Sequence, residues 1–417
     1  MLALTAGILF FCGILCAFTP LLPKGVKVNG IEVGGLTRQQ AASRIRQTFE
    51  DELKEKQLKI RTKRGEYIFK YPEISYKDDL KNLLKSVKKG GEYTADYECY
   101  LCGLSEIAPD ICRNESIFMV EPYAVFNKEG APFTYYAGND GIIANEGELK
   151  KDIQNSLSGS FETVTLKYSH VRRTKTLDEV KKETALLSAF TTYFDGENLT
   201  RTSNIRLAAS SLNGTVLDGG KVLSFNRAVG ERVKERGYLP AKIIVDGEFV
   251  EGVGGGVCQV STTLYNAALL AGLNIAEYHP HSLAVGYVPP SRDAMVSGSS
   301  CDLKIENSSR TPVYIRAQTG KNYISFKIYG ASSGAKFELT SEVTGSIPAT
   351  QELTAEKDKV REGKDGILSN GYLTVKRGGE TKITLIRTDR YAPVKRFVYD
   401  GAEDDSENGQ KQNTVSI

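Results

Sequence analysis

The chain has 417 residues, 40% of them apolar, and its 54 Lys and Arg nearly balance its 51 Asp and Glu, for a net charge of +3. This balance does not indicate a nucleic-acid-binding protein, and the apolar content excludes a largely disordered chain. The length exceeds what one hydrophobic core usually supports, so we expect several domains. With only three histidines and no nucleotide-binding motif, we expect neither a metal site nor a cofactor.

The first 23 residues carry no charged side chain, and residues 2–18 are almost wholly apolar. Such a segment is long enough to cross a bilayer. A secretory signal is the alternative, but its apolar region is usually shorter and ends at a small-residue cleavage site, which is missing here. We therefore expect residues 1–23 to be an N-terminal transmembrane helix that anchors a single-pass protein in the cell membrane, with the bulk of the chain outside.

Residues 25–180 are predicted to contain two related α+β units. In the first, a capping box at Thr37 begins an amphipathic helix, which a β-hairpin and a second helix follow. The second unit starts near residue 120, and its helix begins after Asn145. A further capped helix is expected to run from Thr176 to about Phe190.

Five cysteines follow the anchor, an odd number that leaves at least one thiol free. Cys99 and Cys102 are separated by two residues, with Cys112 close behind. Because no fourth ligand is near, a local disulfide is favoured over a zinc site.

Cys258 is the central candidate for chemistry in residues 188–330. It follows three glycines and precedes an apolar helical pattern that ends at Gly272, so we expect it at a helix N-terminus. The helix dipole and unpaired N–H groups there lower the pKa of a thiol. The glycines let the backbone approach a substrate, and their N–H groups are candidates for an oxyanion hole, so Gly255 and Gly256 are expected substrate contacts.

A nucleophilic thiol needs a base, and two of the three histidines follow Cys258 in the sequence His279-Pro280-His281. In an extended segment both imidazoles would point to the same face, where one serves as the base and the other as a substrate contact. We favour His281 as the base. Asp293 or a backbone carbonyl is expected to orient its ring. The alternative is that Cys258 is a small buried side chain and the histidine pair is structural.

Beyond residue 330, short alternating segments predict a small all-β module over residues 334–400. The polar tail at residues 401–417 is expected to be disordered. The expected fold class is therefore multidomain α+β: an N-terminal transmembrane helix, a duplicated α+β region, a mixed α/β domain and a C-terminal β module.

Residues 188–330 resemble the VanW-like domain family. The matching strings are NGTVL at 213–217, SFN at 224–226, VGER at 229–232, GY at 237–238, GGGVCQVSTTLYN at 254–266, HPHS at 279–282 and RDA at 292–294. Residues 25–180 resemble the peptidoglycan-binding domain that commonly precedes this family, and residues 334–400 are similar to the G-five module of cell-surface proteins. The family likeness implies a protein that faces the cell wall.

Some VanW-like domains are regarded as cysteine L,D-transpeptidases, which implies a role in forming 3-3 peptidoglycan cross-links through a Cys258 thioester. Peptidoglycan stem peptides would then be the partners. Gln259 and Ser261, within the longest motif, are expected to contact substrate. Many members carry Arg where this chain has Tyr278, so Arg232 and Arg292 are the remaining candidates for anion contact. The alternative is a non-catalytic peptidoglycan-binding or cell-envelope scaffold protein.

Overall fold

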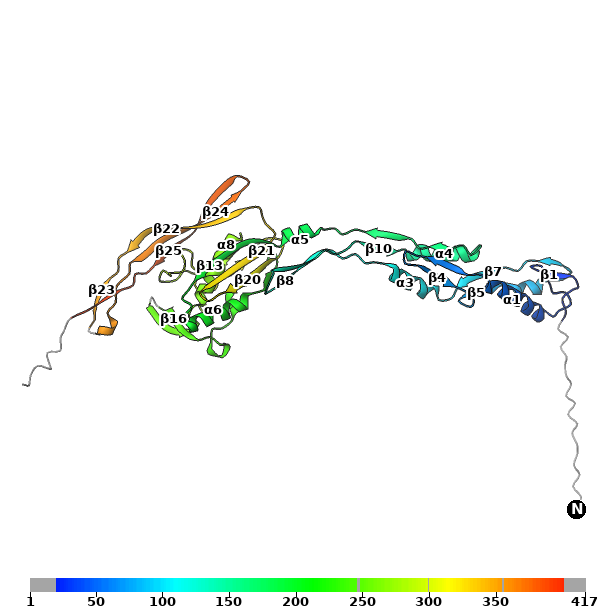
Figure 1. The fold of residues 1–417 in the computed structure, drawn as a ribbon, viewed down its shortest axis with the longest axis horizontal. Helices are drawn as coiled ribbons and strands as arrows, with labels where there is room; N and C mark the ends of the chain where they lie inside the picture. Colours follow the sequence, from blue (N-terminus) through cyan, green and yellow to red (C-terminus); the bar gives the residue numbers. More distant parts are fainter. Residues whose placement is uncertain (1–19, 246–247, 299, 355, 401–417) are drawn as a thin grey trace, which may run out of the picture. The chain divides into compact units, whose positions relative to one another are not determined.

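The computed structural model describes residues 20–245, 248–298, 300–354 and 356–400 (Figure 1). The chain divides into two compact units. The first contains the residues up to Glu121 together with Gly138–Thr174, and the second contains Pro122–Ala137 and the residues from Lys175 onward.

The expectation of an N-terminal transmembrane helix is contradicted by the described part of the chain. A bilayer crossing needs about 20 consecutive apolar residues. Among residues 20–400, apart from the gaps named above, no helix is long and apolar enough to span a membrane. Residues 1–19, on which that expectation rested, and the tail at 401–417 lie outside the described residues.

The first unit combines four helices with short strands. Its helices are α1 (Arg38–Lys54), α2 (Leu80–Ser86), α3 (Leu104–Glu115) and α4 (Glu146–Ser158). Its strands are β1 (Val26–Val28), β2 (Ile31–Glu32), β3 (Leu58–Arg61), β4 (Glu66–Phe69), β5 (Ile74–Asp78), β6 (Gly91–Tyr93), β7 (Tyr97–Leu101), β10 (Gly141–Ala144), β11 (Val164–Thr165) and β12 (Tyr168–Val171). The strands pair as β2-β1-β6, β11-β3-β4, β5-β7 and β10-β12.

Two hydrophobic clusters hold this unit together, and α1 contributes to both. Ala41 and Ile45 of α1 pack in the first cluster, whereas Leu53, near its end, packs in the second. The predicted capping box is confirmed, because the Thr37 side chain accepts from the Gln40 N–H and the Gln40 side chain accepts from the Thr37 N–H. The sequence therefore predicted this helix and its buried face correctly.

The second unit is built from many strands around one buried helix. Its helices are α5 (Leu177–Glu183), α6 (Leu199–Leu212), α7 (Phe225–Val229) and α8 (Val257–Leu270), with 3-10 turns at Lys234–Arg236 and Lys357–Lys359. Its strands are β8 (Tyr123–Phe126), β9 (Phe133–Tyr136), β13 (Ala185–Tyr193), β14 (Thr215–Leu217), β15 (Val222–Ser224), β16 (Pro240–Val245), β17 (Glu248–Val253), β18 (Asn274–Glu277), β19 (Lys304–Glu306), β20 (Val313–Thr319), β21 (Tyr323–Gly330), β22 (Lys336–Ile347), β23 (Gln351–Thr354), β24 (Gly366–Arg377), β25 (Glu380–Tyr391) and β26 (Arg396–Tyr399).

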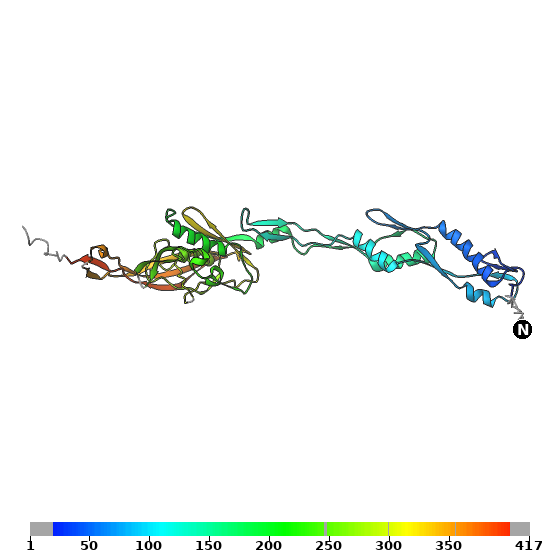
Figure 2. The ribbon, with the colours of Figure 1, turned by 90° about the horizontal axis from the view of Figure 1, so that it is seen from below.

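Helix α8 lies at the centre of this unit. It packs against β13 and β21 of the sheet β13-β21-β20-β14, and also against α6, β18 and β22. Strand β22 belongs to the C-terminal sheet β22-β24-β25, whose long strands are visible in Figure 1 and, from below, in Figure 2. The helix carrying Cys258 therefore contacts both the central sheet and the C-terminal strands.

Two further expectations are wrong. The helix that begins after Thr176 ends at Glu183 rather than near Phe190, because Ala185–Tyr193 form β13 and pair with β21. The local disulfide is also absent: Cys99, Cys102, Cys112, Cys258 and Cys301, the cysteines in the described part of the chain, are all free thiols. The exposed Cys102 lies beside the Pro72 carbonyl, with its Sγ 3.8 Å from that oxygen, whereas Cys99 packs against the core.

Candidate active site

Cys258 occupies the first turn of α8, as its sequence context predicts. The helix is capped by Gly256, whose φ of +103° lies in the region that favours glycine, and Cys258 is half-buried. The N–H of Val257 donates to the Gly254 carbonyl and that of Gln259 to the Gly256 carbonyl. In the described part of the chain, no hydrogen-bond partner is found for the Cys258 N–H.

A buried asparagine fixes the glycine turn before Cys258. The Asn204 side chain donates to the carbonyls of Leu239 and Gly255, at 2.8 and 3.0 Å, and accepts from the Leu239 N–H. A Cβ at Gly255 would lie 2.7 Å from the Lys242 carbonyl oxygen, so the strand beside the turn leaves no room for a larger residue. The turn that presents the thiol is therefore rigidly held.

His281 is the imidazole that reaches the thiol. Its ring is 5% exposed and interacts with Cys258, while its Nδ1 lies 2.7 Å from Oδ2 of Asp293. The same oxygen also accepts from the His281 backbone N–H at 2.8 Å. Because a carboxylate only accepts, Nδ1 carries the proton and Nε2 is left to face the thiol. Cys258, His281 and Asp293 thus form a continuous polar line.

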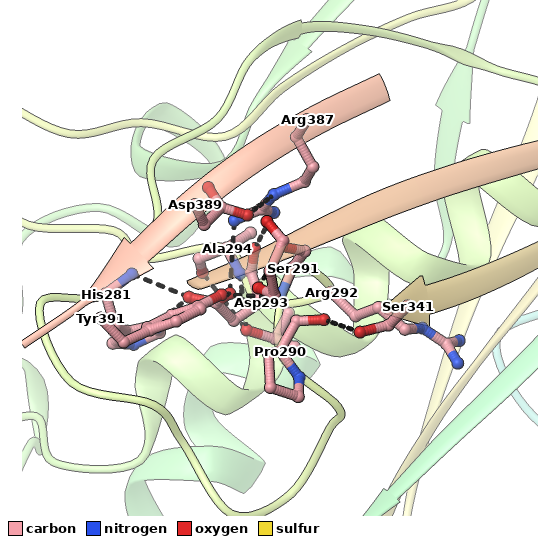
Figure 3. A network of polar contacts seen from close by, with 12 residues as sticks. His281, Pro290, Ser291, Arg292, Asp293, Ala294, Ser341, Arg387, Asp389 and Tyr391 are labelled. Atoms are coloured by element: carbon pink, nitrogen blue, oxygen red, sulfur yellow. Dashed lines mark hydrogen bonds and ion pairs between the residues drawn. The ribbon is translucent and has the colours of Figure 1, made fainter. Parts of the chain in front are cut away.

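The C-terminal strand β25 holds Asp293 from its other side (Figure 3). Oδ1 of Asp293 accepts from the Tyr391 hydroxyl at 2.5 Å and from Arg387 at 3.3 Å, and Arg387 also donates to the Asp293 carbonyl. A second carboxylate, that of Asp389, accepts from Nε of Arg387 at 2.6 Å. All three strand residues are buried, so the module fixes the carboxylate that orients His281.

The turn before Asp293 is fixed by the same strands. Ser291 has a φ of +60°, a conformation that costs energy for a residue with a side chain. Its N–H donates to the Tyr391 oxygen at 2.7 Å, and its hydroxyl lies 2.7 Å from that of Ser369 on β24. Gly371 permits this approach, since a Cβ there would lie 2.8 Å from the Ser291 carbonyl oxygen.

The three side chains of the polar line shift one another's proton affinities. Burial raises the pKa of the Cys258 thiol, but the hydrogen bond and charge of His281, the backbone hydrogen bond of Val296 and the charge of Arg232 outweigh it and lower this pKa. Burial lowers the pKa of His281, but Asp293 and Cys258 raise it to about 9. Burial raises the pKa of Asp293, yet His281, Arg387 and Tyr391 bring it to about 2. These directions favour a thiolate–imidazolium pair at neutral pH.

His279 does not join this line. Its Nε2 lies 3.0 Å from Oε1 of Glu277, and Lys304 pairs with the other oxygen of that carboxylate at 2.7 Å. The expectation that both histidines face one site did not include Glu277, an acid two residues before His279. The neighbouring Tyr278 faces Arg387, whose guanidinium lies 4.6 Å from the ring centre.

Gln259 and Ser261 make internal hydrogen bonds. The Gln259 side chain accepts from Arg201 at 2.7 Å and donates to the Thr192 hydroxyl and the Tyr193 carbonyl. The Ser261 hydroxyl donates to the Ala294 carbonyl at 2.6 Å, next to Asp293. Both side chains thus position the elements around the thiol.

The two predicted anion-contact arginines have different surroundings. Arg232 lies near the thiol, where its head donates to the Asn226 side chain. Arg292 instead donates to Asn266 at 2.9 Å, and its guanidinium lies 5.1 Å from the ring centre of Phe190.

Sequence reasoning missed four residues around this site. Arg201 and Tyr287 interact electrostatically with Cys258, and burial raises the pKa of the Tyr287 phenol. No local pattern marks either residue. Arg387, Asp389 and Tyr391 alternate along one strand and so share a face, but this alternation does not indicate that the face packs against Asp293.

No group of three or more His, Cys, Asp or Glu side chains within the described ranges is placed to hold a metal ion. The side chains gathered at Cys258 are a thiol of lowered pKa, an imidazole beside it and a carboxylate that contacts the imidazole, which are the groups from which a nucleophilic centre can be built.

Comparisons with known proteins agree with the motif strings. The family model described as VanW like protein matches residues 200–329. The uncharacterized protein YoaR of Bacillus subtilis (strain 168) is 45% identical over 175 residues, which cover 42% of this chain and 57% of YoaR. The vancomycin B-type resistance protein VanW of Enterococcus faecalis (strain ATCC 700802 / V583) is 32% identical over 111 residues, which cover 25% of this chain and 40% of that protein.

The chain therefore spans less than two thirds of each of these relatives. No solved structure matches the chain. Residues 334–400 lie outside the matched family model, so their likeness to the G-five module stays a prediction, as does the peptidoglycan-binding role of residues 25–180. Residues 200–329 match the VanW-like family, so this part of the chain is a VanW-like domain.

Proposed function

We propose that the chain is a cysteine acyltransferase of the cell wall, an L,D-transpeptidase that forms 3-3 cross-links between peptidoglycan stem peptides. The observation that carries this proposal is the line from Cys258 through His281 to Asp293, with its 2.7 Å contact between imidazole and carboxylate. A thiolate held beside an imidazolium is the ground state that cysteine acyl transfer requires.

In the first half-reaction, the Cys258 thiolate attacks the carbonyl of the third residue of a tetrapeptide stem. The C–S bond forms, the amide bond to the terminal D-alanine breaks, and His281 gives its proton to the leaving amine. In the second, His281 accepts a proton from the amine of a neighbouring stem as that amine attacks the thioester. The thiolate leaves, and one amide bond has been exchanged for another without any external energy source.

The backbone around the thiol supports stabilisation of the tetrahedral intermediate. The unpartnered N–H of Cys258 lies at the N-terminus of α8, where the helix dipole also favours negative charge. Asp293 keeps the His281 ring in one orientation through both half-reactions and stabilises the imidazolium.

The cell-wall substrate class rests on family likeness. One relative is named as a vancomycin B-type resistance protein. Vancomycin-type resistance concerns cell-wall assembly, and a substrate there would require this chain to act outside the cytoplasm. We accordingly propose that residues 25–180 bind peptidoglycan and bring the stem peptides to Cys258.

The test uses the full chain with purified tetrapeptide muropeptides, and mass spectrometry of the products. Wild type is expected to release D-alanine and to form 3-3 linked dimers, and Cys258→Ala is expected to form none. Absence of both products from folded wild type would reject the transpeptidase, as would equal products from Cys258→Ala. Release of D-alanine without dimers would identify a hydrolase.

A non-catalytic wall-binding or scaffold protein is the second candidate. One observation favours it: the half-buried thiol donates to the Val296 carbonyl at 3.4 Å, a contact that a purely structural cysteine also makes. This alternative predicts that Cys258→Ala lowers thermal stability, while binding to isolated sacculi stays unchanged.

A further inference from the structure

Two arginine side chains line the glycine turn that presents Cys258. A Cβ at Gly254 would lie 3.0 Å from Cβ and 3.3 Å from Cγ of Arg232, and a Cβ at Gly256 would lie 3.0 Å from Cγ of Arg201. The glycines therefore leave the space that both arginine stems occupy. Arg201 comes from α6 and Arg232 from the segment after α7, so two separate elements bring positive charge to one turn.

Neither guanidinium contacts an acid directly in the described part of the chain. Arg201 donates to the amide oxygen of Gln259 at 2.7 Å, and Arg232 donates to the amide oxygen of Asn226. Within the described ranges, neither arginine forms an ion pair with Asp or Glu. Two acids act on these arginines only from a distance: Asp195 on Arg201, and Asp302 on Arg232. Asp302 also accepts from the Ser224 hydroxyl at 2.6 Å.

Such charges are costly to keep half-buried. Burial lowers the pKa of both arginines, and the sulfur of Cys258 acts in the opposite direction on both. Each guanidinium has five N–H donors, and among the described residues one amide oxygen accepts from each, so other donors remain for a ligand. Uncompensated cations beside a nucleophile are typical of a site that receives an anion, and a planar guanidinium fits a carboxylate best.

We propose that Arg201 and Arg232 form a carboxylate subsite beside Cys258, which binds a free carboxylate one residue beyond the carbonyl that the thiolate attacks. This inference rests on the proposed acyl transfer. In a peptide donor, the C-terminal carboxylate of the leaving amino acid is the group that would occupy this subsite. Donors that end in a free carboxylate are then preferred over donors whose last residue is amidated.

The test compares two small alkylating reagents on the full chain, without any peptide. Iodoacetate carries a carboxylate and iodoacetamide does not, and both lose iodide as the Cys258 sulfur forms an S–C bond. The measured quantity is the rate constant for iodoacetate divided by that for iodoacetamide. This ratio does not depend on the thiolate fraction, so a shifted thiol pKa does not change it. Wild type is expected to show a higher ratio than free cysteine does.

Variants then test whether Arg201 and Arg232 cause the higher ratio. The double variant Arg201→Gln/Arg232→Gln is expected to lower the ratio about tenfold, the size expected for losing a partly buried charge contact. Arg201→Lys and Arg232→Lys should retain most of the ratio. Arg206→Gln, an exposed arginine on the same helix, is the matched control and should leave the ratio unchanged. Circular dichroism checks that each variant is folded.

A wild-type ratio equal to that of free cysteine would overturn the subsite, as would a folded double variant that keeps the wild-type ratio. The outcome is separable from the fate of the proposed function. If tetrapeptides are not turned over but the ratio falls in the double variant, the anion subsite stands without the transpeptidase. If tetrapeptides are turned over and the ratio is unchanged, only the subsite is wrong.

Discussion

The hydroxyl of Tyr391 donates a 2.5 Å hydrogen bond to Oδ1 of Asp293, the carboxylate that orients the His281 ring. The two residues are 98 positions apart, and Tyr391 ends the last long strand of the C-terminal sheet. The same hydroxyl accepts from the Ser291 N–H. The C-terminal module is therefore part of the candidate active site.

Tyr391→Phe is expected to destabilise the chain by about 1–3 kcal/mol, because it leaves the buried Ser291 N–H without an acceptor and removes a donor from Asp293. Urea unfolding monitored by circular dichroism measures the change. Tyr372→Phe, whose hydroxyl donates to Glu342 on a more exposed part of the sheet, is the control and should cost less. Equal losses in the two variants would contradict the role given to Tyr391.

Arg387→Met is expected to cost about 3–5 kcal/mol of unfolding free energy, since it leaves the buried carboxylates of Asp293 and Asp389 without their shared cation. Arg387→Lys should recover part of this loss. Both variants are compared with wild type by the same urea titration. A loss below about 1 kcal/mol, the range of exposed ion pairs, would mean that the cation does not hold the two carboxylates together.

The two histidines should behave differently. His281→Gln removes the main group that lowers the pKa of Cys258, so its reaction with iodoacetamide at pH 7 should slow about tenfold or more, since each pKa unit changes the thiolate fraction about tenfold. His279→Gln should leave the rate close to wild type, because that ring pairs with Glu277. A slower reaction in His279→Gln than in His281→Gln would reverse the assignment of the base.

Acid should weaken the second unit through Asp293. Its pKa is about 2 in the folded chain against an ordinary 3.8, so its contribution to stability is complete above about pH 4 and is lost as the pH falls toward 2. Asp293→Asn lacks this contribution at every pH. Calorimetry should therefore find that the difference in Tm between wild type and Asp293→Asn is larger at pH 5 than at pH 3. A difference independent of pH would contradict the lowered pKa.

Local features of the site could be predicted from the sequence. The glycines before Cys258 and the apolar period after it correctly placed this residue at the start of α8, because caps and helical faces depend on nearby residues. The helix expected to reach Phe190 ends earlier in the structure. The reason is that β13 pairs with β21, which lies 130 or more residues further along the chain, and this pairing outweighs local helix signals.

Contacts between distant segments could not be predicted in this way. The approach of β25 to Asp293 depends on how the C-terminal sheet packs, and no spacing in the sequence records that packing. The approach of Arg201 to the turn before Cys258 depends likewise on the packing of α6 against α8. Cys258 and His281 stand in continuous motifs and could be singled out from the sequence, whereas Arg201 and Tyr391 stand outside such motifs and could not.

The most direct test of the account is the intact mass of the full chain after brief incubation with a tetrapeptide stem and no acceptor amine. Acyl transfer by Cys258 predicts an adduct equal to the donor minus D-alanine, located on Cys258 by peptide mapping and absent from Cys258→Ala. As a thioester, it should be cleaved by hydroxylamine to the free thiol and a hydroxamate. Folded wild type that releases D-alanine without this adduct, or an equal adduct in Cys258→Ala, would contradict acyl transfer by Cys258.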